Sequence, residues 1–359
     1  MRHWLAVSTL VALFAIPARA QQVPEIPFES ASVLQLPDGM YLGEVAGVAV
    51  NSKKHLFVFH RGNVSGPAFG ALASQLLEFG PDGKFIKEIG KGLYSMAYAH
   101  TVRVDRSDNI WIVDKGSDMV VKFTPEGRVA MVFGRKKESS DQAEPWERVT
   151  PPAAHVDQQF RQPTDVTWDP AGNIYISDGY INARIAKYDK NGEWVGSFGT
   201  HGEGPLQFNT PHSIASDVNG NLYVADRGNR RVQVLDPNGK LLREIRISVP
   251  APPDAKPAIG NPITPQSTPQ SQAGAPWAVC VSPGPTQYLY VSDAFPGRIY
   301  KLTLDGRVVG MLGKSGKQPK QFGWIHEIAC PSENELYVAE ILNWRIQKLT
   351  LRPSAASTQ

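Results

Sequence analysis

The sequence contains few cysteines and little net charge. Only two cysteines, Cys280 and Cys330, occur in 359 residues, which excludes a disulfide-rich scaffold. They lie near the same point in adjacent repeats, and the residues alone leave a single bridge and two buried thiols as equal alternatives. A formal net charge of +3 is too small to favour nucleic acids or anionic membranes as partners. We therefore expect neither kind of partner.

Long apolar runs are also missing after the first twenty residues, which have the pattern of a secretory signal peptide. A basic start precedes an apolar run from Trp4 to Pro17, and an Ala-Arg-Ala sequence ends at Ala20. The run is shorter than the roughly 20 residues that a membrane span needs, although an uncleaved anchor is the alternative. We predict a signal peptide over residues 1–20, a secreted or periplasmic mature protein, and no membrane span.

What the sequence has is an internal repeat, of which six copies follow the signal peptide. Each copy contains short alternating apolar and polar runs separated by turn signals such as Asn-Gly and Asp-Gly, typical of antiparallel hairpins. Four strands per copy indicate a propeller blade, and blades packed around an axis bury the apolar face that each exposes alone. The copies begin at Ala46, Ala99, Pro163, Pro211, Pro276 and Ile325.

The predicted fold is therefore all-β, a six-bladed β-propeller of four-stranded antiparallel blades formed by residues 21–351 as one domain. Residues 352–359 are expected to be a disordered tail. The sixth copy ends near Leu351 without a clear fourth strand, so we predict that residues 31–36 complete it and close the ring. An open solenoid is the alternative, but it would need polar caps.

Two insertions interrupt the repeat. Residues 135–162 are charged and proline-rich, and residues 249–275 are rich in Pro, Ser and Gln. We expect the second to be a mobile loop with little structure of its own. Either insertion could cover the mouth of the channel, but solvated decoration is the simpler interpretation.

One column of the repeat contains three histidines. Since alternate blades of a six-bladed ring stand about 120° apart, histidines in blades two, four and six would approach the axis from three directions. A lone histidine on a strand is more often a satisfied polar residue than a ligand, but three in one column favour a metal site with open positions. Zinc is the first expectation, and iron, copper or nickel would also suit imidazole. The column reads Gly47, His100, Thr164, His212, Trp277 and His326.

The end of the second strand carries a second informative column. An acidic residue recurs there in five blades, so we assign it a structural role in satisfying backbone turns, whereas blade one has His60. The five acidic residues are Asp114, Asp178, Asp226, Asp293 and Glu340.

The position after this column is cationic in three blades, with Arg61, Lys115 and Arg227. It shares a face of the ring with the histidines, so these cations could bind a carboxylate through bidentate hydrogen bonds. Solvated surface charge is the alternative, which we prefer for Lys115. Nearby, Tyr180 stands where the closest copies of the repeat have a glycine, so the backbone at this turn has less conformational freedom than in those copies. Its phenol could be functional, or it could pack over the mouth, as Phe295 does in its own copy.

At these residues the chain resembles a known family. The blades resemble NHL repeats, and the marked positions resemble the peptidyl-α-hydroxyglycine α-amidating lyases, whose catalytic core is a six-bladed propeller. The resemblance spans all blades but the fifth. The similar stretches are the His100 segment, FHRG at Phe59–Gly62, SDGYINARI at Ser177–Ile185, TPHSIA at Thr210–Ala215, VADRGNRRVQ at Val224–Gln233 and WIHEIA at Trp324–Ala329.

The resemblance implies a role for particular residues. It places zinc ligands at His100, His212 and His326, a catalytic tyrosine at Tyr180, and two active-site arginines at Arg61 and Arg227. It also implies a structural calcium, held in the family by two backbone carbonyls and an aspartate, at Val48, Val102 and Glu327, where glutamate lengthens the acidic arm. The family's cysteine beside the tyrosine is absent, since Ile181 stands there.

The implied function is that of a metal-dependent carbon–nitrogen lyase. Such an enzyme cleaves an N-acyl α-hydroxyglycine into an amide and glyoxylate, with Tyr180 as general base and the arginines holding the carboxylate. The expected partner is a small molecule or peptide with a glyoxylate-derived carboxylate, and we expect a monomer. The alternative is a non-catalytic NHL propeller that serves as a secreted binding platform.

Overall fold

The computed structural model describes residues 23–62, 73–136, 154–257 and 268–352. The predicted signal peptide, residues 137–153 and 258–267 of the two insertions, and residues 353–359 of the tail lie outside the described residues. Within the described ranges, no helix is both long and apolar enough to cross a membrane.

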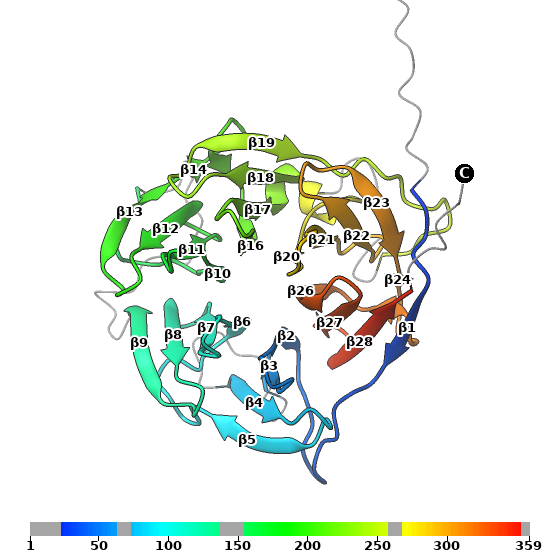
Figure 1. Cartoon of the computed structure of the whole chain (residues 1–359), viewed down its shortest axis with the longest axis horizontal. Coiled ribbons are helices and arrows are strands. Elements are labelled where there is room, and N and C mark those ends of the chain that lie inside the picture. The colour runs from blue at the N-terminus through cyan, green and yellow to red at the C-terminus, as the bar shows by residue number, and fades with distance from the viewer. Residues whose placement is uncertain (1–22, 63–72, 137–153, 258–267, 353–359) are drawn as a thin grey trace, which may run out of the picture.

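Six four-stranded antiparallel sheets are arranged as blades around a central axis, as predicted (Figure 1). Blade one contains β2 (Val45–Val50), β3 (Leu56–His60), β4 (Gln75–Phe79) and β5 (Phe85–Ile89). Blade two contains β6 (Ala99–Val104), β7 (Ile110–Asp114), β8 (Met119–Phe123) and β9 (Val129–Gly134). Blade three contains β10 (Asp165–Trp168), β11 (Ile174–Asp178), β12 (Arg184–Tyr188) and β13 (Trp194–Phe198).

The second half of the ring repeats this order. Blade four contains β16 (Pro211–Ser216), β17 (Leu222–Asp226), β18 (Arg231–Leu235) and β19 (Leu241–Ile245). Blade five contains β20 (Val279–Val281), β21 (Tyr288–Ser292), β22 (Ile299–Thr303) and β23 (Val308–Leu312). Blade six contains β26 (Ile325–Ser332), β27 (Glu335–Glu340), β28 (Arg345–Leu351) and β1 (Phe28–Ala31).

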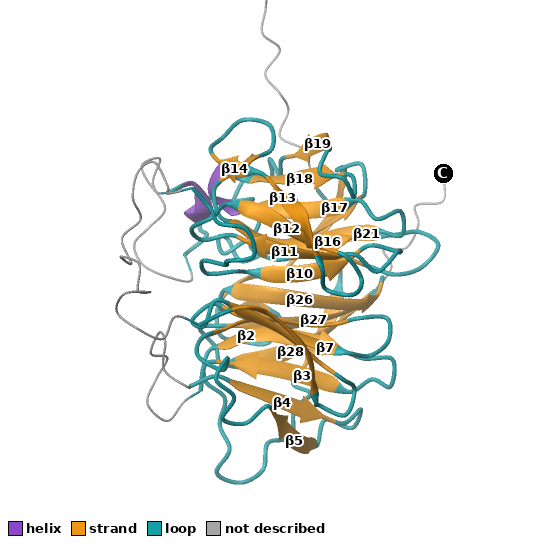
Figure 2. Ribbon diagram, turned by 90° about the vertical axis from the view of Figure 1, so that its left-hand side faces the viewer, coloured by secondary structure: helices purple, strands orange, loops and turns teal. Residues whose placement is uncertain are grey.

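Short elements decorate the ring. Two parallel pairs join β14 (Thr200–His201) to β15 (Gln207–Phe208) and β24 (Lys314–Ser315) to β25 (Gln321–Phe322). The 3₁₀ helices are η1 (Arg227–Asn229) and η2 (Pro269–Ser271). In the view from the side, strands fill the middle of the molecule and loops lie at either end of them (Figure 2).

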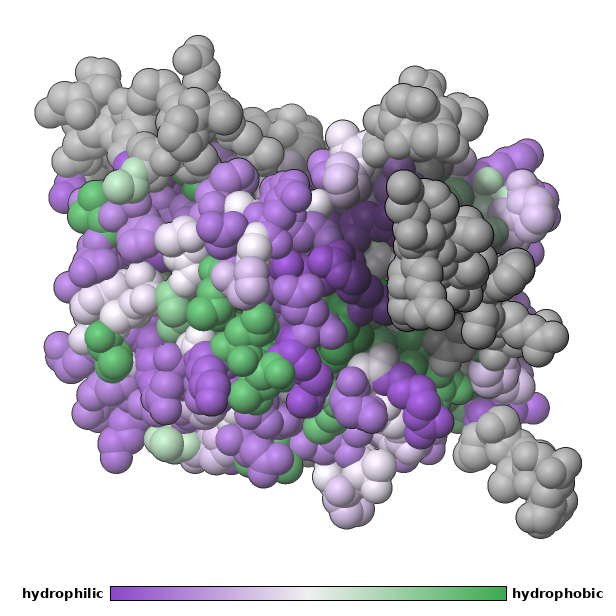
Figure 3. All heavy atoms as spheres, turned by 90° about the horizontal axis from the view of Figure 1, so that it is seen from above, coloured by the Kyte–Doolittle hydropathy of each residue, from purple (hydrophilic) through white to green (hydrophobic). Residues whose placement is uncertain are grey.

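The hydrophobic core lies between neighbouring blades. Phe57 and Phe59 of blade one pack in one cluster with Ile112 and Phe123 of blade two, and the other blade interfaces have clusters of the same kind. Apolar residues on both faces of each sheet explain why a single blade cannot fold alone. On the outside, polar residues cover most of the rim that Figure 3 shows, with smaller apolar groups between them.

The turn signals in the sequence close the hairpins as expected. In the β10–β11 and β16–β17 turns, Gly172 and Gly220 have φ values of +90° and +81°, which glycine adopts without steric cost. Asp169 and Asp217 accept hydrogen bonds from backbone N–H groups of the same turns. The local sequence therefore fixes hairpin register around the ring.

A strand from the N-terminal end closes the ring as predicted, but it is not the predicted segment. β1 pairs with β28, with Phe28 opposite Leu351 and Ala31 opposite Lys348, so pairing ends where residues 31–36 begin. Phe28 anchors β1 through an apolar contact, since its ring stacks on Phe322 of β25. Residues 33–35 instead reach blade one, where the Gln35 N–H donates to the Gly83 carbonyl oxygen.

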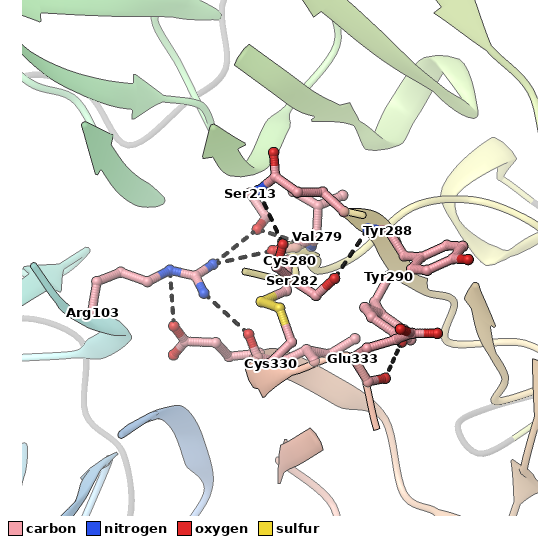
Figure 4. The surroundings of a disulfide bond; sticks show 12 residues. Arg103, Ser213, Val279, Cys280, Ser282, Tyr288, Tyr290, Cys330 and Glu333 are labelled. Carbon is pink, nitrogen blue, oxygen red and sulfur yellow. Dashed lines mark hydrogen bonds and ion pairs between the residues drawn. A yellow bond between two sulfur atoms is a disulfide. The ribbon is translucent and has the colours of Figure 1, made fainter. Parts of the chain in front are cut away.

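The two cysteines form a disulfide, which resolves the alternatives that the sequence left open. Cys280 of β20 and Cys330 of β26 are joined, with their Cα atoms 6.1 Å apart. The bond links the inner strands of blades five and six (Figure 4), so it crosses a blade interface close to the ring closure.

The described flanks of the second insertion are packed rather than mobile. Val249 and Ala275 are buried, the Pro250 carbonyl oxygen accepts a hydrogen bond from Arg298, and the Gln270 carbonyl oxygen accepts one from Trp277 Nε1. The expectation of a loop with little structure is therefore wrong for these flanks.

Candidate metal centre

Three histidines meet on the propeller axis. The ring centroid of His100 lies 4.8 Å from that of His212 and 4.5 Å from that of His326, and the latter two are 5.0 Å apart. One nitrogen from each lies within 4.8 Å of the others, and all three side chains are buried. They come from β6, β16 and β26 of blades two, four and six, as the repeat predicted.

A β-bulge aims these side chains at the axis. In blades two and six the register of the first strand pair shifts between Ala99 and Thr101 and between Ile325 and Glu327, so the histidine is the extra residue. In blade four the shift covers His212 and the following residue. Bulges re-aim side chains near functional sites, and here they turn the imidazoles inward.

Each imidazole is oriented by the next blade. Nδ1 of His100, His212 and His326 lies 2.6, 2.7 and 2.8 Å from a backbone carbonyl oxygen, so Nδ1 donates and Nε2 is left as the ligand atom. The three acceptors are the carbonyls of Thr164, Trp277 and Ala46.

These hydrogen bonds show that the sequence analysis misassigned one member of the histidine column, the residue of blade one. Ala46, and not Gly47, occupies the column in blade one, because the bulge in β2 lies between Val45 and Gly47. Neither Ala46 nor Gly47 has a functional side chain, so the sequence alone did not show which of them occupies the column.

The three imidazoles are held neutral. Burial lowers the pKa of each well below its ordinary value, and nearby positive charges act in the same direction. Neutral imidazole is the form that binds a metal, and Nε2 of His212 is buried with no hydrogen-bond partner among the described residues. Three buried, inward-facing imidazole nitrogens are therefore a donor set that could hold a metal ion.

Tyr180 stands beside this cluster. Its hydroxyl is 3.4 Å from His100 Nε2, and its ring is edge-on to both His100 and His212. Burial alone would raise the pKa of the phenol, but the charges of Arg227, Lys115 and Arg61 and a hydrogen bond from Arg227 lower it below its ordinary value. The phenol of Tyr180 therefore lies beside the histidine cluster and ionises more readily than an ordinary tyrosine.

The two arginines of the column also face this site. Arg227 lies over the ring of Trp277 at 4.1 Å and 5.4 Å from the ring of Tyr180. Arg61 donates from Nε to the Ala99 carbonyl oxygen and from Nη1 to Glu44. Arg61 and Glu44 therefore form an ion pair beside the site.

Lys115 is not the ordinary surface charge that we preferred. It is half-buried, and its Nζ lies 3.6 Å from the centre of the Tyr180 ring. A cation this close to an aromatic face contributes both attraction and electrostatic stabilisation of a phenolate.

The acidic column has the structural role that was predicted. In blades two, three and four the carboxylate accepts backbone N–H groups from the segment before the first strand, as Asp114 does from Ala97 and Tyr98. In blade one, His60 performs this role through Nδ1, which accepts the N–H groups of Gly43 and Gly62 at 3.2 and 3.1 Å.

Comparisons with known proteins show what this chain is similar to. An NHL repeat model matches residues 208–235. Peptidyl-glycine alpha-amidating monooxygenase of Mus musculus is 31% identical over 262 residues, which make up 65% of this chain and 25% of that protein. A probable peptidyl-alpha-hydroxyglycine alpha-amidating lyase of Caenorhabditis elegans is 30% identical, with 54% of this chain and 55% of that protein covered. The chain is a six-bladed propeller that contains an NHL repeat and is related to the α-amidating lyases.

A longer match is found with peptidyl-alpha-hydroxyglycine alpha-amidating lyase 1 of Drosophila melanogaster, which is 26% identical over 88% of this chain and 58% of that protein. This NHL propeller thus spans less than two thirds of each of these relatives. Among solved structures, virginiamycin B lyase of Staphylococcus aureus has a TM-score of 0.55 at 13% identity, covering 91% of this chain and 100% of that one. A gluconolactonase of Xanthomonas campestris has 0.57 at 13%, covering 94% and 97%. Both show the fold alone.

The residues at the expected calcium position of this NHL propeller do not fit calcium. Oε2 of Glu327 accepts the N–H groups of Val48 and Val102 at 3.0 and 3.2 Å, so these residues present donors to the carboxylate. Its Oε1 lies 3.2 Å from Nε of Arg103. Calcium requires a shell of oxygens, whereas a guanidinium already lies against this carboxylate, and we assign no calcium here.

Sequence reasoning missed several residues of the site. Glu44 was not found because it lies before the first copy, and Trp277 was read only as a column member. Trp324 packs edge-on against Trp277 with ring centroids 4.6 Å apart, and Tyr98 lies 4.0 Å from the Arg61 guanidinium. The available signal was an aromatic residue two positions before a column histidine, as Tyr98 precedes His100 and Trp324 precedes His326.

Proposed function

We propose that this protein is a metal-dependent lyase that cleaves an N-acyl α-hydroxyglycine into an amide and glyoxylate. The observation that carries the proposal is the set of three axial histidines whose Nδ1 atoms are all fixed by carbonyl oxygens. Relatives named as α-amidating lyases support the reaction class. We also propose that the mature chain is exported, as a secreted or periplasmic protein.

His100, His212 and His326 would hold the metal through Nε2, with zinc as the proposed ion. A zinc ion bound there would act as a Lewis acid toward the substrate hydroxyl. The buried, neutral state of the imidazoles supports this assignment, because no proton has to be displaced before a metal binds.

Tyr180, as a phenolate, would accept the proton of the substrate hydroxyl. The electrons of that O–H bond then form the carbonyl of glyoxylate, and the bond between the α-carbon and nitrogen breaks. The nitrogen takes back the proton that Tyr180 received and becomes the amide, which regenerates the phenolate. The cations around Tyr180 favour its phenolate form.

Arg227 would bind the carboxylate that becomes part of glyoxylate. It shares the mouth with Tyr180 and Trp277, and arginine binds carboxylates in bidentate geometry. The charge of Arg61 lowers the pKa values of His326 and Tyr180, so we assign Arg61 mainly to holding the positive potential of the site.

The test is to incubate the protein with an N-acyl α-hydroxyglycine and to measure glyoxylate with and without a strong chelator. The proposal expects enzyme-dependent glyoxylate release that the chelator abolishes and zinc restores. As a matched control, His201→Ala removes an exposed histidine and should leave the rate unchanged. A metal-free protein without turnover would refute the lyase and favour the binding platform.

A further inference from the structure

A second charged cluster lies on the axis, and the proposed reaction does not use it. Arg103 of β6 donates from Nε and Nη2 to the two carboxylate oxygens of Asp165 at 2.9 and 2.6 Å. Its Nη1 donates to the Ile328 carbonyl oxygen at 3.1 Å, and Nη2 also lies 3.4 Å from the Val279 carbonyl oxygen. Figure 4 shows the guanidinium reaching toward Ser213 and Val279 beside the disulfide.

These partners come from different blades. Asp165 belongs to blade three, Ser213 to blade four, Val279 to blade five and Glu327 to blade six, while Arg103 itself comes from blade two. Blade one is joined indirectly, because Glu327 also accepts the Val48 N–H. One side chain therefore connects the inner strands of the entire ring.

The cluster is directly linked to the histidine layer. Glu327 follows His326 in the sequence, Ser213 follows His212, and Arg103 lies on the same strand as His100. Oγ of Ser213 lies 3.4 Å from Nη2 of Arg103 and also donates to Asp165 at 2.7 Å. The guanidinium thus contacts the strand of every axial histidine.

We propose that Arg103 is a built-in axial cation that ties the histidine-bearing strands together and makes the propeller independent of calcium. Two buried carboxylates and two carbonyl oxygens need a positive charge between them. A guanidinium supplies that charge permanently and donates in several directions at once. In the metal site, Arg103 is a positioning residue that acts through the three strands.

The proposal predicts what remains when the guanidinium is removed. Arg103→Ala leaves the Asp165 and Glu327 carboxylates, the Ser213 hydroxyl and two backbone carbonyls around one space. Such a set of oxygens is what calcium prefers, and magnesium, which keeps most of its waters, suits it less well. Calcium should therefore replace the missing cation in the variant but have no role in the native protein.

The experiment compares thermal unfolding of the native protein, Arg103→Ala and Arg231→Ala, each with a calcium chelator, with millimolar calcium and with millimolar magnesium. Arg231 is the matched control, because it is a buried arginine that binds Asp226, Glu244 and two carbonyl oxygens away from the axis. Both variants should unfold on the order of 5–10 °C lower than the native protein. Only Arg103→Ala should recover stability in calcium.

A competition titration measures zinc affinity, which general destabilisation of the fold would not change. Of the two measurements, only this one rests on the proposed function. Without calcium, Arg103→Ala should bind zinc about tenfold more weakly, whereas Arg231→Ala should match the native protein. If no form bound zinc, the proposed function would fail while the unfolding data would still test Arg103.

Two results would overturn the proposal. One is a native protein that contains stoichiometric calcium or whose unfolding temperature rises when calcium is added. The other is an Arg103→Ala protein whose unfolding temperature is the same with and without calcium. Should that variant fail to fold, Arg103→Lys retains a cation and should be less stable than the native protein yet unresponsive to calcium, and a calcium response there would contradict the proposal.

Discussion

His60 should make the stability of this protein depend on pH in a predictable way. Burial lowers the pKa of this imidazole from 6.5 to about 4, and its Nδ1 accepts two N–H groups inside blade one. The unfolded chain therefore binds a proton near pH 6.5, whereas the folded chain resists protonation until about pH 4. The contribution is fully present above pH 6.5 and is lost as the pH falls toward 4.

The magnitude follows from the difference between these two pKa values. A shift of about 2.5 units corresponds to roughly 3 kcal/mol of unfolding free energy lost between pH 7 and pH 4. The substitution that isolates this effect is His60→Asn, because the amide oxygen of asparagine is bonded to the same side-chain carbon as Nδ1 is and does not titrate. It should still accept the N–H groups of Gly43 and Gly62.

The assay is urea unfolding of both proteins across this pH range. The difference in unfolding free energy should move by about 3 kcal/mol in favour of His60→Asn as the pH falls. Other titrating groups, including the axial histidines, are common to both proteins and cancel in the difference. Parallel curves for the two proteins would refute the reasoning, and the exposed His201→Asn should give such parallel curves with the native protein.

Three further predictions concern the site and the disulfide. Tyr180→Phe should retain the metal but lower kcat about 10²- to 10⁴-fold, and full turnover with intact metal content would contradict its role as base. Arg227→Met should lower kcat/KM about 100-fold, and it should shift the acid limb of the pH–rate profile to higher pH because the pKa of Tyr180 rises. Steady-state kinetics across the pH range measure both effects. An unchanged KM would argue against carboxylate binding by Arg227. Replacing Cys280 and Cys330 by serine opens a loop of 50 residues and should lower the unfolding free energy by about 4 kcal/mol in urea, so a loss below about 1 kcal/mol would show that the blade interface closes without it.

The repeat made the fold and the histidine column predictable from the sequence. Each blade has its own apolar–polar alternation and turn residues, so the local sequence determines the register of its hairpins. The three histidines recur at one position of the repeat. Tyr180, Arg61 and Arg227 were found because they depart from their neighbours in equivalent columns.

The features that could not be predicted depend on contacts between distant parts of the chain. Arg103 binds partners that lie 62, 110, 176 and 225 residues away, and no local pattern encodes such a meeting. The closing strand was misplaced because apolar residues 33 and 34 look like a strand but pack against blade one. A bulge shifted the column in blade one by one residue.

The central claim is that three imidazoles from alternate blades bind one metal ion. The most direct test is the metal content of the purified native protein beside His212→Ala and the control His201→Ala, each dialysed against dilute chelator. The claim predicts one equivalent of metal in the native protein and the control, and none in His212→Ala. A native protein without metal, or an unchanged metal content in His212→Ala, would contradict it.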